Sequence, residues 1–359
     1  MRTQSNKLNF EGENIYVGID VHLKSWNVTI YTEYLHHKTF NQPPVPSILR
    51  DYLNTNFPGG TYYSAYEAGF CGFNIHFELK KLNINNIVVN PADIPTSQKE
   101  QILKNDSRDS MKIARSLRAN ELIGIHVPFI ETLENRTLIR TRDVMVKDMT
   151  RFKQRIKALL YFYGISYPPE FEKSTRHWSN RFLKWLKEEV SLSTANGNDA
   201  LSLLIREVEQ QRVLLLEINR KIHSLAISEK YVKEIELIRS IPGIGLVTGL
   251  TFLSEIEDIE RFPNTDKLAG FVGLIPTCHS SGEVENYGEI TFRKKTTLRR
   301  WLIESAWVAV RIDPALTRCF SQLCKRMEPN KAIIRITRKL LNRMYYVLKK
   351  RQKYECGVV

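Results

Sequence analysis

Two hydrophobic periods alternate along the first ~130 residues, and this alternation restricts the fold more than any other feature of the sequence. Short apolar runs typical of strands are separated by stretches in which apolar residues recur every three or four positions. The expected strands are 15–19, 26–31, 37–40, 61–66 and 86–89, and the expected helices are 47–54, 72–82 and one that begins near residue 105. The pattern predicts a mixed α/β domain in which the first strands pair antiparallel.

Two long helical patterns follow this domain. Residues 133–163 are rich in Arg and Lys, with apolar residues every three or four positions. Residues 200–227 show an approximate heptad seam, formed by Leu204, Val208, Val213, Leu216, Ile218, Ile222 and Leu225. The two helices either pack into the core of one chain or form an extended hairpin that projects from the α/β domain and pairs with a second protomer, because a seam of about four heptads fits both.

The last part of the chain combines a tight turn with concentrated positive charge. Residues 241–245 (Ile-Pro-Gly-Ile-Gly) lie between apolar helical stretches and predict a helix-hairpin-helix, whose backbone amides can point at a phosphate. Gly243 and Gly245 are equally compatible with a tight helical corner that makes no DNA contact. Residues 286–359 hold 18 basic and 5 acidic residues, so they carry +13 of the net charge of +14. This concentration predicts a polyanionic partner.

Composition excludes several classes of protein. The chain is 42% hydrophobic and 26% charged, which is typical of folded globular proteins and not of disordered or collagen-like ones. The five cysteines are scattered without a CxxC pair, so we expect reduced thiols and neither a disulfide framework nor a structural zinc site. Apolar runs are too short to cross a bilayer and residues 1–10 lack the apolar core of a signal peptide, so we expect a cytoplasmic protein without membrane contacts.

Four acidic residues of the first domain occupy positions where acids are not expected for stability. Asp20 and Glu67 each end an apolar strand, and Asp106 and Asp109 lie one turn apart on the expected helix. Converging carboxylates repel one another unless cations hold them, so these four are predicted to bind two Mg²⁺ or Mn²⁺ ions roughly 4 Å apart. Two such ions suit phosphodiester transfer, because one activates the attacking oxygen and the other stabilises the leaving oxygen.

Each carboxylate also has an ordinary explanation. Asp106 suits an N-cap, Asp109 can pair with Arg108 or Lys112, and an aspartate that ends a strand is common at turns. His22 and His76 are near the acids in sequence and are candidate ligands, but lone histidines near a site more often pack or support it.

Two groups of short segments carry a resemblance to a known family. The first group is 18–21 (Gly-Ile-Asp-Val), 66–72 (Tyr-Glu-Ala-Gly-x-x-Gly) and 104–109 (Lys-Asn-Asp-Ser-Arg-Asp). The second group is 241–245, 270–276, the pair Ser281-Gly282 and 298–300 (Leu-Arg-Arg). In this order they resemble the motifs of the DEDD insertion-sequence transposases, whose cousins are the Piv-type DNA invertases. The match runs from residue 15 to about residue 343.

The resemblance implies a fold of class α/β plus α. It implies an RNase H-like (RuvC-like) catalytic domain, a helical coiled-coil hairpin, and a mainly helical transposase domain with a helix-hairpin-helix. The expected bounds are 12–165 for the catalytic domain, 166–232 for a helical or coiled-coil linker, and 233–359 for the transposase domain. Two departures from the family's pattern stand out. Ser110 replaces the usual alanine after the second acid of the third motif, and residues 288–295 lack the glycine that normally follows a Ser/Thr-Lys pair before the Leu-Arg-Arg helix.

The resemblance also implies a site. Asp20, Glu67, Asp106 and Asp109 match the metal-binding tetrad. Ser281 matches the nucleophilic serine, which attacks a DNA phosphate and forms a covalent protein and DNA intermediate. Without the family match Ser281 is an ordinary turn residue, and two alternative nucleophiles are Ser280 and Tyr287.

The partners implied are donor and target DNA, a structured noncoding RNA that guides recombination, and further copies of the chain. In this family the serine and the tetrad are thought to meet between protomers, which gives the helical hairpin a role in a dimer or tetramer. The residues expected to contact nucleic acid are Arg140, Lys147, Arg151, Gly243, Gly245, Arg299 and Arg300.

The leading hypothesis is an insertion-sequence transposase acting as a metal-dependent serine recombinase. A Piv-type site-specific invertase keeps the same chemistry and differs in the DNA that flanks its gene. A RuvC-like junction nuclease predicts that Ser281→Ala still cleaves DNA. A binding protein without catalysis predicts that Asp20→Ala or Asp109→Asn leaves every activity intact.

Overall fold

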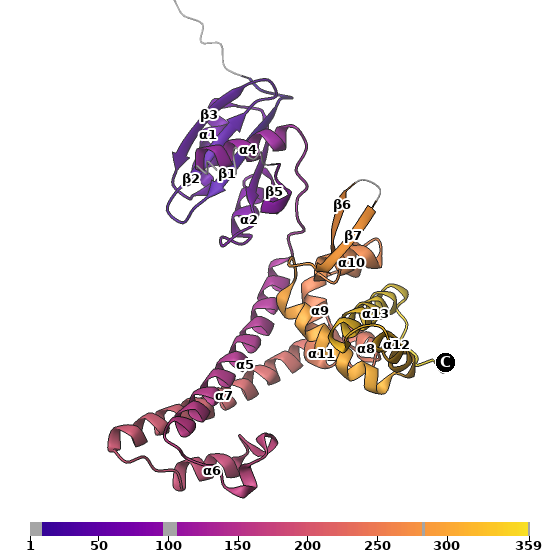
Figure 1. Cartoon of the computed structure of the whole chain (residues 1–359). Coiled ribbons are helices and arrows are strands. Elements are labelled where there is room, and N and C mark those ends of the chain that lie inside the picture. The colour runs from indigo at the N-terminus through magenta and orange to yellow at the C-terminus, as the bar shows by residue number, and fades with distance from the viewer. Residues whose placement is uncertain (1–8, 96–105, 282–283, 358–359) are drawn as a thin grey trace, which may run out of the picture. The chain divides into compact units, whose positions relative to one another are not determined.

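The computed structural model describes residues 9–95, 106–281 and 284–357, and the side chains of Asp106 and of residues 278–287 lie outside this description. The chain forms two compact units, Met1–Val127 and Pro128–Val359, called here the N-terminal and C-terminal units (Figure 1). The helix after this boundary belongs to the C-terminal unit, because its Arg136 donates to the backbone oxygens of Ser254 and Glu255 at 2.6 and 3.0 Å. The division into domains at residues 165 and 232 stays a prediction.

The N-terminal unit is built on a five-stranded sheet of order β3-β2-β1-β4-β5. Strands β1, β2 and β3 pair antiparallel, whereas β4 pairs parallel with β1 and with β5. The elements are β1 (Asn14–Val21), β2 (Trp26–Tyr31), β3 (His36–Gln42), α1 (Pro46–Asn56), β4 (Thr61–Glu67), α2 (Asn74–Lys81), β5 (Asn85–Val89), the short η1 (Pro91–Asp93) and α4 (Asp106–Arg118). The expected mixed α/β domain and its antiparallel pairing are confirmed.

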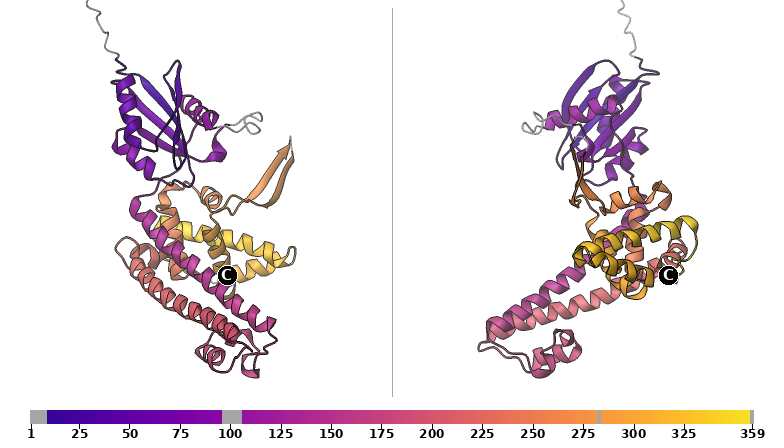
Figure 2. Two further views of the ribbon diagram at one scale, coloured as in Figure 1. Left: turned by 90° about the vertical axis from the view of Figure 1, so that its left-hand side faces the viewer. Right: turned by 45° about the vertical axis from the view of Figure 1, so that its right-hand side comes forward.

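Helices cover both faces of this sheet (Figure 2). Val17 of β1 belongs to one buried cluster with Leu53 of α1 and Leu79 of α2. The neighbouring residue Gly18 faces α4, since side chains along a strand alternate between its two faces. The sheet therefore has α1 and α2 on one face and α4 on the other.

The C-terminal unit begins with a long helical hairpin. Helix α5 (Ile130–Phe162) and helix α7 (Ala195–Ala226) lie side by side (Figures 1 and 2). The shorter elements between them are η2 (Pro169–Phe171), η3 (Ser174–Arg176) and α6 (Asn180–Glu188). Val208, Ile218 and Ile222 of the expected seam are buried, but Val213 and Leu216 are 66% and 60% exposed. The two long helices are present and pack on each other, whereas the apolar seam is only partly used within one chain, and pairing with a second protomer stays a prediction.

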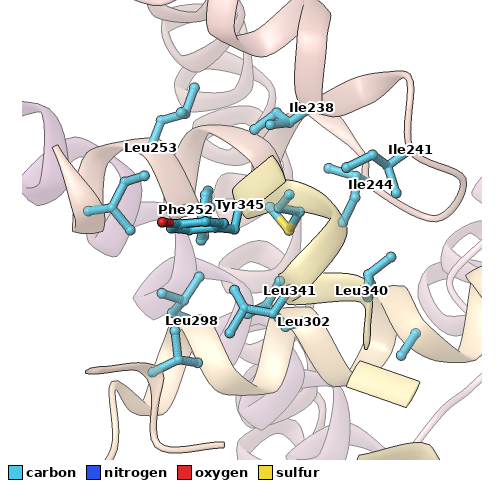
Figure 3. Packing of buried hydrophobic residues seen from close by; sticks show 14 of the residues in the cluster. Ile238, Ile241, Ile244, Phe252, Leu253, Leu298, Leu302, Leu340, Leu341 and Tyr345 are labelled. Carbon is cyan, nitrogen blue, oxygen red and sulfur yellow. The ribbon is translucent and has the colours of Figure 1, made fainter. Parts of the chain in front are cut away.

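The rest of the C-terminal unit is a helical body with one β-hairpin. Its elements are α8 (Val232–Arg239), α9 (Leu246–Ile256), η4 (Ile259–Arg261), α10 (Thr265–Val272), β6 (Pro276–Ser281), β7 (Val284–Ile290), α11 (Thr296–Ile312), α12 (Pro314–Cys324) and α13 (Pro329–Lys350). Phe252, Leu302 and Leu341 are fully buried at its centre (Figure 3). Across the described part of the chain, every helix is too short or too polar to span a membrane.

Candidate active site

Asp20 and Glu67 occupy equivalent positions at the carboxyl ends of two neighbouring strands. The parallel register pairs Gly18 of β1 with Ala65 of β4, which places Asp20 opposite Glu67 two positions further along. Because side chains alternate along a strand, both acids share the face of Gly18 and Ala65, and α4 packs on that face. The prediction that strand-end acids meet at one edge of the sheet agrees with this register.

Helix α4 approaches β1 closely enough that only glycine fits between them. A Cβ atom on Gly18 would stand 2.1 Å from the backbone oxygen of Ser110 and 2.4 Å from the backbone nitrogen of Ala114. Asp109 precedes Ser110 on α4, and its side chain is 22% exposed. The close approach therefore brings a third acid-bearing element onto the face that carries Asp20 and Glu67.

A buried network of polar side chains fixes the start of α4 against β2. Ser110 Oγ donates to Asn27 Oδ1 at 2.6 Å and lies 2.8 Å from Thr29 Oγ1. Asn27 Nδ2 donates in turn to Ser107 Oγ at 3.2 Å. Asn27 pairs with Asp20 in the register of β1 and β2, so the network holds α4 beside the strand end that carries Asp20.

Sequence reasoning missed this network, although β2 contains a signal for it. Asn27 and Thr29 alternate with the apolar residues Trp26, Val28 and Ile30, and all five are buried. Buried polar side chains need hydrogen-bond partners, so this alternation indicates a polar contact with whatever covers that face. The contact also explains Ser110, whose hydroxyl supplies the partner that alanine lacks.

Two basic side chains lie next to these acids. Lys112 Nζ donates to Asp109 Oδ1 at 3.2 Å, and the Lys112 side chain is only 10% exposed. His22 Nδ1 lies 3.7 Å from Asp20 Oδ2 and is half-exposed. The ordinary explanation for Asp109, an ion pair with Lys112, is thus present in the structure.

His76 lies on the other face of the sheet and packs there. His76 Nδ1 is 2.8 Å from Asn86 Oδ1, and Asn86 Nδ2 donates to Ser64 Oγ at 2.8 Å. Ser64 precedes Ala65 on β4, so these bonds lie on the face covered by α1 and α2. Burial lowers the pKa of His76, because desolvation outweighs the hydrogen bond to Asn86. Of its two possible roles, the structure supports packing and not metal ligation.

The ligand atoms available at the two strand ends and on α4 fit a hard divalent cation. Asp20, Glu67 and Asp109 offer carboxylate oxygens, which Mg²⁺ and Mn²⁺ prefer. Asp106 is the first residue of α4, but its side chain is outside the described set. Among the side chains that are described, three or more His, Cys, Asp or Glu residues do not form a group that could hold a metal ion. The four-carboxylate site stays a prediction.

Ser281 is the last residue of β6, where it pairs with Val284 of β7. The side chains of Ser281 and of both alternative nucleophiles, Ser280 and Tyr287, lie outside the described set, as does Gly282. The choice of nucleophile stays a prediction, while the backbone places Ser281 at the end of a hairpin strand.

The segments on either side of this β-hairpin, at Gly273 and Thr291, are held to the helical body by hydrogen bonds from α11. Gly273 has a φ of +85°, and a Cβ there would stand 2.5 Å from the backbone oxygen of Arg293. Arg299 Nη1 donates to the backbone oxygens of Gly273 and Thr291, both at 2.8 Å. In the described part of the chain, no residue of 288–295 has a positive φ, so the turn before the Leu-Arg-Arg helix does not require the glycine that this chain lacks.

The cations predicted to contact nucleic acid on α5 and α11 also bind protein groups. Asp143 is buried and accepts bonds from two of them. Burial raises the pKa of Asp143, but the hydrogen bonds from Lys147 and Arg300 outweigh burial and hold the pKa below its usual range. The ion pairs are Arg140 with Glu255 at 2.5 Å, Lys147 with Asp143 at 2.9 Å, Arg300 with Asp143, and Arg151 with Asp148 at 2.8 Å. Contact of these cations with nucleic acid stays a prediction.

The two glycines of the predicted helix-hairpin-helix have different surroundings. Gly243 has a φ of +89°, and a Cβ there would stand 2.4 Å from the backbone oxygen of Ser305 in α11. Gly245 is exposed and is the N-cap of α9, and a Cβ there would have nothing within 4 Å. The alternative of a tight helical corner therefore accounts for Gly243, whereas Gly245 leaves the helix N-terminus open.

Both units match families of known proteins. Residues 17–165 match a DEDD-type IS110 family model described as "Transposase", and residues 235–321 match the "Transposase IS116/IS110/IS902 family". Both descriptions name transposases, so the protein is an enzyme of the DNA transposase and recombinase class. The chain belongs to the DEDD insertion-sequence transposase family.

Three curated relatives illustrate the similarity. A Sinorhizobium fredii protein named as a transposase is 29% identical over 245 residues, which are 68% of this chain and 58% of that relative. The transposase for insertion sequence element IS1533 of Leptospira borgpetersenii is 28% identical over 309 residues, with 82% of this chain and 84% of the relative covered. The pilin gene-inverting protein of Moraxella bovis is 26% identical over 277 residues, with 75% and 74% covered.

Proposed function

We propose that this chain is an insertion-sequence transposase that cuts and rejoins DNA through a covalent bond to Ser281, with divalent metal ions bound by Asp20, Glu67, Asp106 and Asp109. The observation that carries the proposal is the placement of Asp20, Glu67 and the helix of Asp109 on one face of the mixed sheet. Membership of the DEDD family supports it independently.

We infer further that the N-terminal unit is an RNase H-like domain of the RuvC type. Three antiparallel strands followed by two parallel ones, with helices on both faces, support this inference. The first acid lies on the central strand β1, the second on the adjacent β4 and the third on α4. The resemblance implies this order of acids along the chain.

The carboxylates would hold two Mg²⁺ or Mn²⁺ ions. When bound, such ions activate the attacking oxygen and stabilise the leaving oxygen of a phosphodiester. The network of Asn27, Ser107 and Ser110 would keep α4 in place while like charges gather beside it. Lys112, which already donates to Asp109, adds positive charge where the DNA phosphate must approach.

In the proposed transfer, Ser281 Oγ attacks a backbone phosphorus of DNA. A bond forms between Oγ and phosphorus, the bond from phosphorus to one DNA oxygen breaks, and the leaving oxygen takes up the proton that the serine releases. A hydroxyl of another DNA end then attacks the phosphoserine, which returns the proton to Ser281 and completes the exchange. Arg299 and Gly273 would support the reaction by fixing the base of the hairpin.

The proposed partners are donor and target DNA, a structured noncoding guide RNA and further copies of the chain in a dimer or tetramer. Exposed Val213 and Leu216 on α7 support an apolar contact between protomers, because these seam positions are not used within one chain. The open N-terminus of α9 at Gly245 supports a phosphate contact there.

A DNA invertase is the second candidate, and the similarity to the pilin gene-inverting protein of Moraxella bovis favours it. The chemistry would be the same for both. Sequencing of the DNA that flanks the gene separates them, because a transposase lies between element ends and an invertase lies beside paired inverted recombination sites.

The proposal is tested by strand-transfer assays with Mg²⁺ and DNA that carries the element's junction. We expect Asp20→Asn and Asp109→Asn to lose cleavage and transfer while they still bind DNA. Asp51→Asn is the matched control, because Asp51 is exposed on α1 across the sheet from the proposed site. Normal transfer by Asp20→Asn and Asp109→Asn would refute the metal site, and normal cleavage by Ser281→Ala would favour a junction nuclease.

A further inference from the structure

Six of the seven basic residues of α13 fall into two groups according to their partners. One group forms ion pairs, namely Arg338 with Asp266 at 2.5 Å, Arg343 with Asp313 at 2.7 Å and Lys349 with Glu260 at 2.7 Å. In the described part of the chain, no carboxylate lies within ion-pair distance of Lys331, Arg335 or Lys339. Ion pairs therefore neutralise the three cations of the first group, whereas the positive charge of the second group is not neutralised by a carboxylate.

The second group forms a single stripe along α13. Lys331, Arg335 and Lys339 are spaced four residues apart, so they lie on the same side of the helix, and all three are exposed. Like charges at this spacing repel one another and destabilise a helix. A bound anion would offset this repulsion.

Two residues of the stripe line a cavity beside α12. The cavity has a volume of about 410 Å³. Its lining residues are Cys319, Gln322, Leu323, Arg326, Arg335 and Lys339, and we call it the α12–α13 pocket. Three of these six residues are cations, and an acid is not among them.

We propose that the α12–α13 pocket and its stripe bind the phosphate backbone of a nucleic acid. Proteins commonly bind phosphate oxygens with the guanidinium group of arginine and the ammonium group of lysine. The stripe from Lys331 to Lys339 extends about 12 Å at 1.5 Å per residue, whereas phosphates on one strand of a duplex follow every 3.4 Å along the axis. A strand of several nucleotides thus fits the site better than a single small anion.

This inference depends on the chain being a nucleic-acid enzyme and not on the serine chemistry or the metal site proposed above. DNA and RNA offer the same phosphodiester chemistry, so both are tested as separate probes. Binding is measured by anisotropy, which needs no catalytic turnover, and Asp51→Asn on α1 of the other unit serves as a binding control. Failure of catalysis and failure of phosphate binding are therefore distinguishable.

The test is fluorescence anisotropy with the full chain, using a 20-base-pair DNA duplex in one arm and an RNA hairpin in the other. The pocket variant carries Arg326→Ala, Arg335→Ala and Lys339→Ala. The charge-matched control carries Arg181→Ala, Arg206→Ala and Arg220→Ala, which removes three exposed cations of α6 and α7. Thermal unfolding checks that each variant folds, and the single change Arg335→Gln replaces the triple variant if that one does not.

We expect the pocket variant to bind at least one probe about tenfold more weakly at 150 mM salt, with the control near the wild-type affinity. The slope of log affinity against log salt should become shallower by roughly 2 to 3, since each lost phosphate contact contributes about 0.9 for a duplex. Loss with one probe identifies DNA or RNA as the ligand. Unchanged affinity and slope with both probes, or an equal loss in the control, would overturn the proposal.

Discussion

Gly18 of β1 faces the backbone oxygen of Ser110 in α4 so closely that a Cβ on Gly18 would stand 2.1 Å from it. This contact determines how near α4 lies to the strand that carries Asp20. The helix start that holds Asp109 therefore depends on a residue that has no side chain.

Gly18→Ala should push α4 away from β1. Overpacking of this kind costs about 1–3 kcal/mol of unfolding free energy, and here the clash is with backbone that cannot move aside cheaply. Hydrogen exchange measured by mass spectrometry should show faster exchange in α4 and β1. Gly69→Ala is the control, because a Cβ there meets only the Glu67 backbone oxygen at 3.9 Å. Equal protection in Gly18→Ala and wild type would contradict the close contact.

Ser110→Ala should lower the unfolding free energy by about 1–3 kcal/mol, because it removes a partner from buried Asn27 and Thr29. The loss should appear in urea unfolding and as faster exchange at the start of α4. Ser47→Ala, at an exposed position of α1, should change neither measurement. A neutral effect of Ser110→Ala would mean that the network does not hold α4.

Gly243→Ala and Gly245→Ala should differ although they lie two residues apart. Gly243→Ala introduces a Cβ at a φ of +89° and 2.4 Å from the Ser305 backbone oxygen, so we expect a loss of about 1–3 kcal/mol in unfolding free energy. Gly245→Ala meets open space at a φ of −83° and should be nearly neutral. Thermal unfolding of both variants distinguishes them, and similar stabilities would argue against the helical corner.

Arg299→Gln should loosen the base of the serine-bearing hairpin, because one guanidinium nitrogen bonds both Gly273 and Thr291. We expect faster hydrogen exchange in residues 274–276 and 288–295, together with reduced strand transfer. Arg311→Gln, at an exposed position near the end of α11, is the control. Loss of DNA affinity without faster exchange would instead make Arg299 a phosphate contact.

The N-terminal unit should lose stability in mild acid through His76. Its folded pKa is lowered by burial, so the unfolded chain, with a pKa near 6.5, binds more protons as pH falls below that value. Stability is therefore present above about pH 6.5 and falls as pH drops toward the folded pKa. Urea unfolding at pH 7.5 and 5.5 should show a smaller pH effect in His76→Gln than in the wild type. The same pH effect in both proteins would exclude His76 as its source.

The sequence predicted local elements better than it predicted their partners. The strands and helices of the N-terminal unit follow from the two hydrophobic periods, which depend on nearby residues alone. The membership of α5 in the C-terminal unit depends on bonds such as those of Arg136 to the end of α9, which no local pattern contains. In the same way, the heptad seam indicated an apolar face but not that Val213 and Leu216 would be exposed.

Prediction of the candidate site from the sequence is limited in the same way, because local patterns do not show which distant residues come into contact. Strand-end positions predict that Asp20 and Glu67 lie at one edge of the sheet, because parallel strands end there, and the register of β1 and β4 agrees with this placement. The bond between Asn27 and Ser110 joins residues 83 positions apart and needs the fold to be seen. Charge counting likewise could not separate Arg338, which pairs with Asp266, from the neighbouring Lys339, which lines the pocket.

The proposed recombination depends on a covalent bond between Ser281 and DNA. The most direct measurement incubates the chain with Mg²⁺ and junction DNA, digests both, and searches by mass spectrometry for a nucleotide on Ser281. We expect an adduct in the wild type that disappears in Ser281→Ala together with recombinant product. Recombinant product without an adduct at Ser281, or product formed equally by Ser281→Ala, would contradict it.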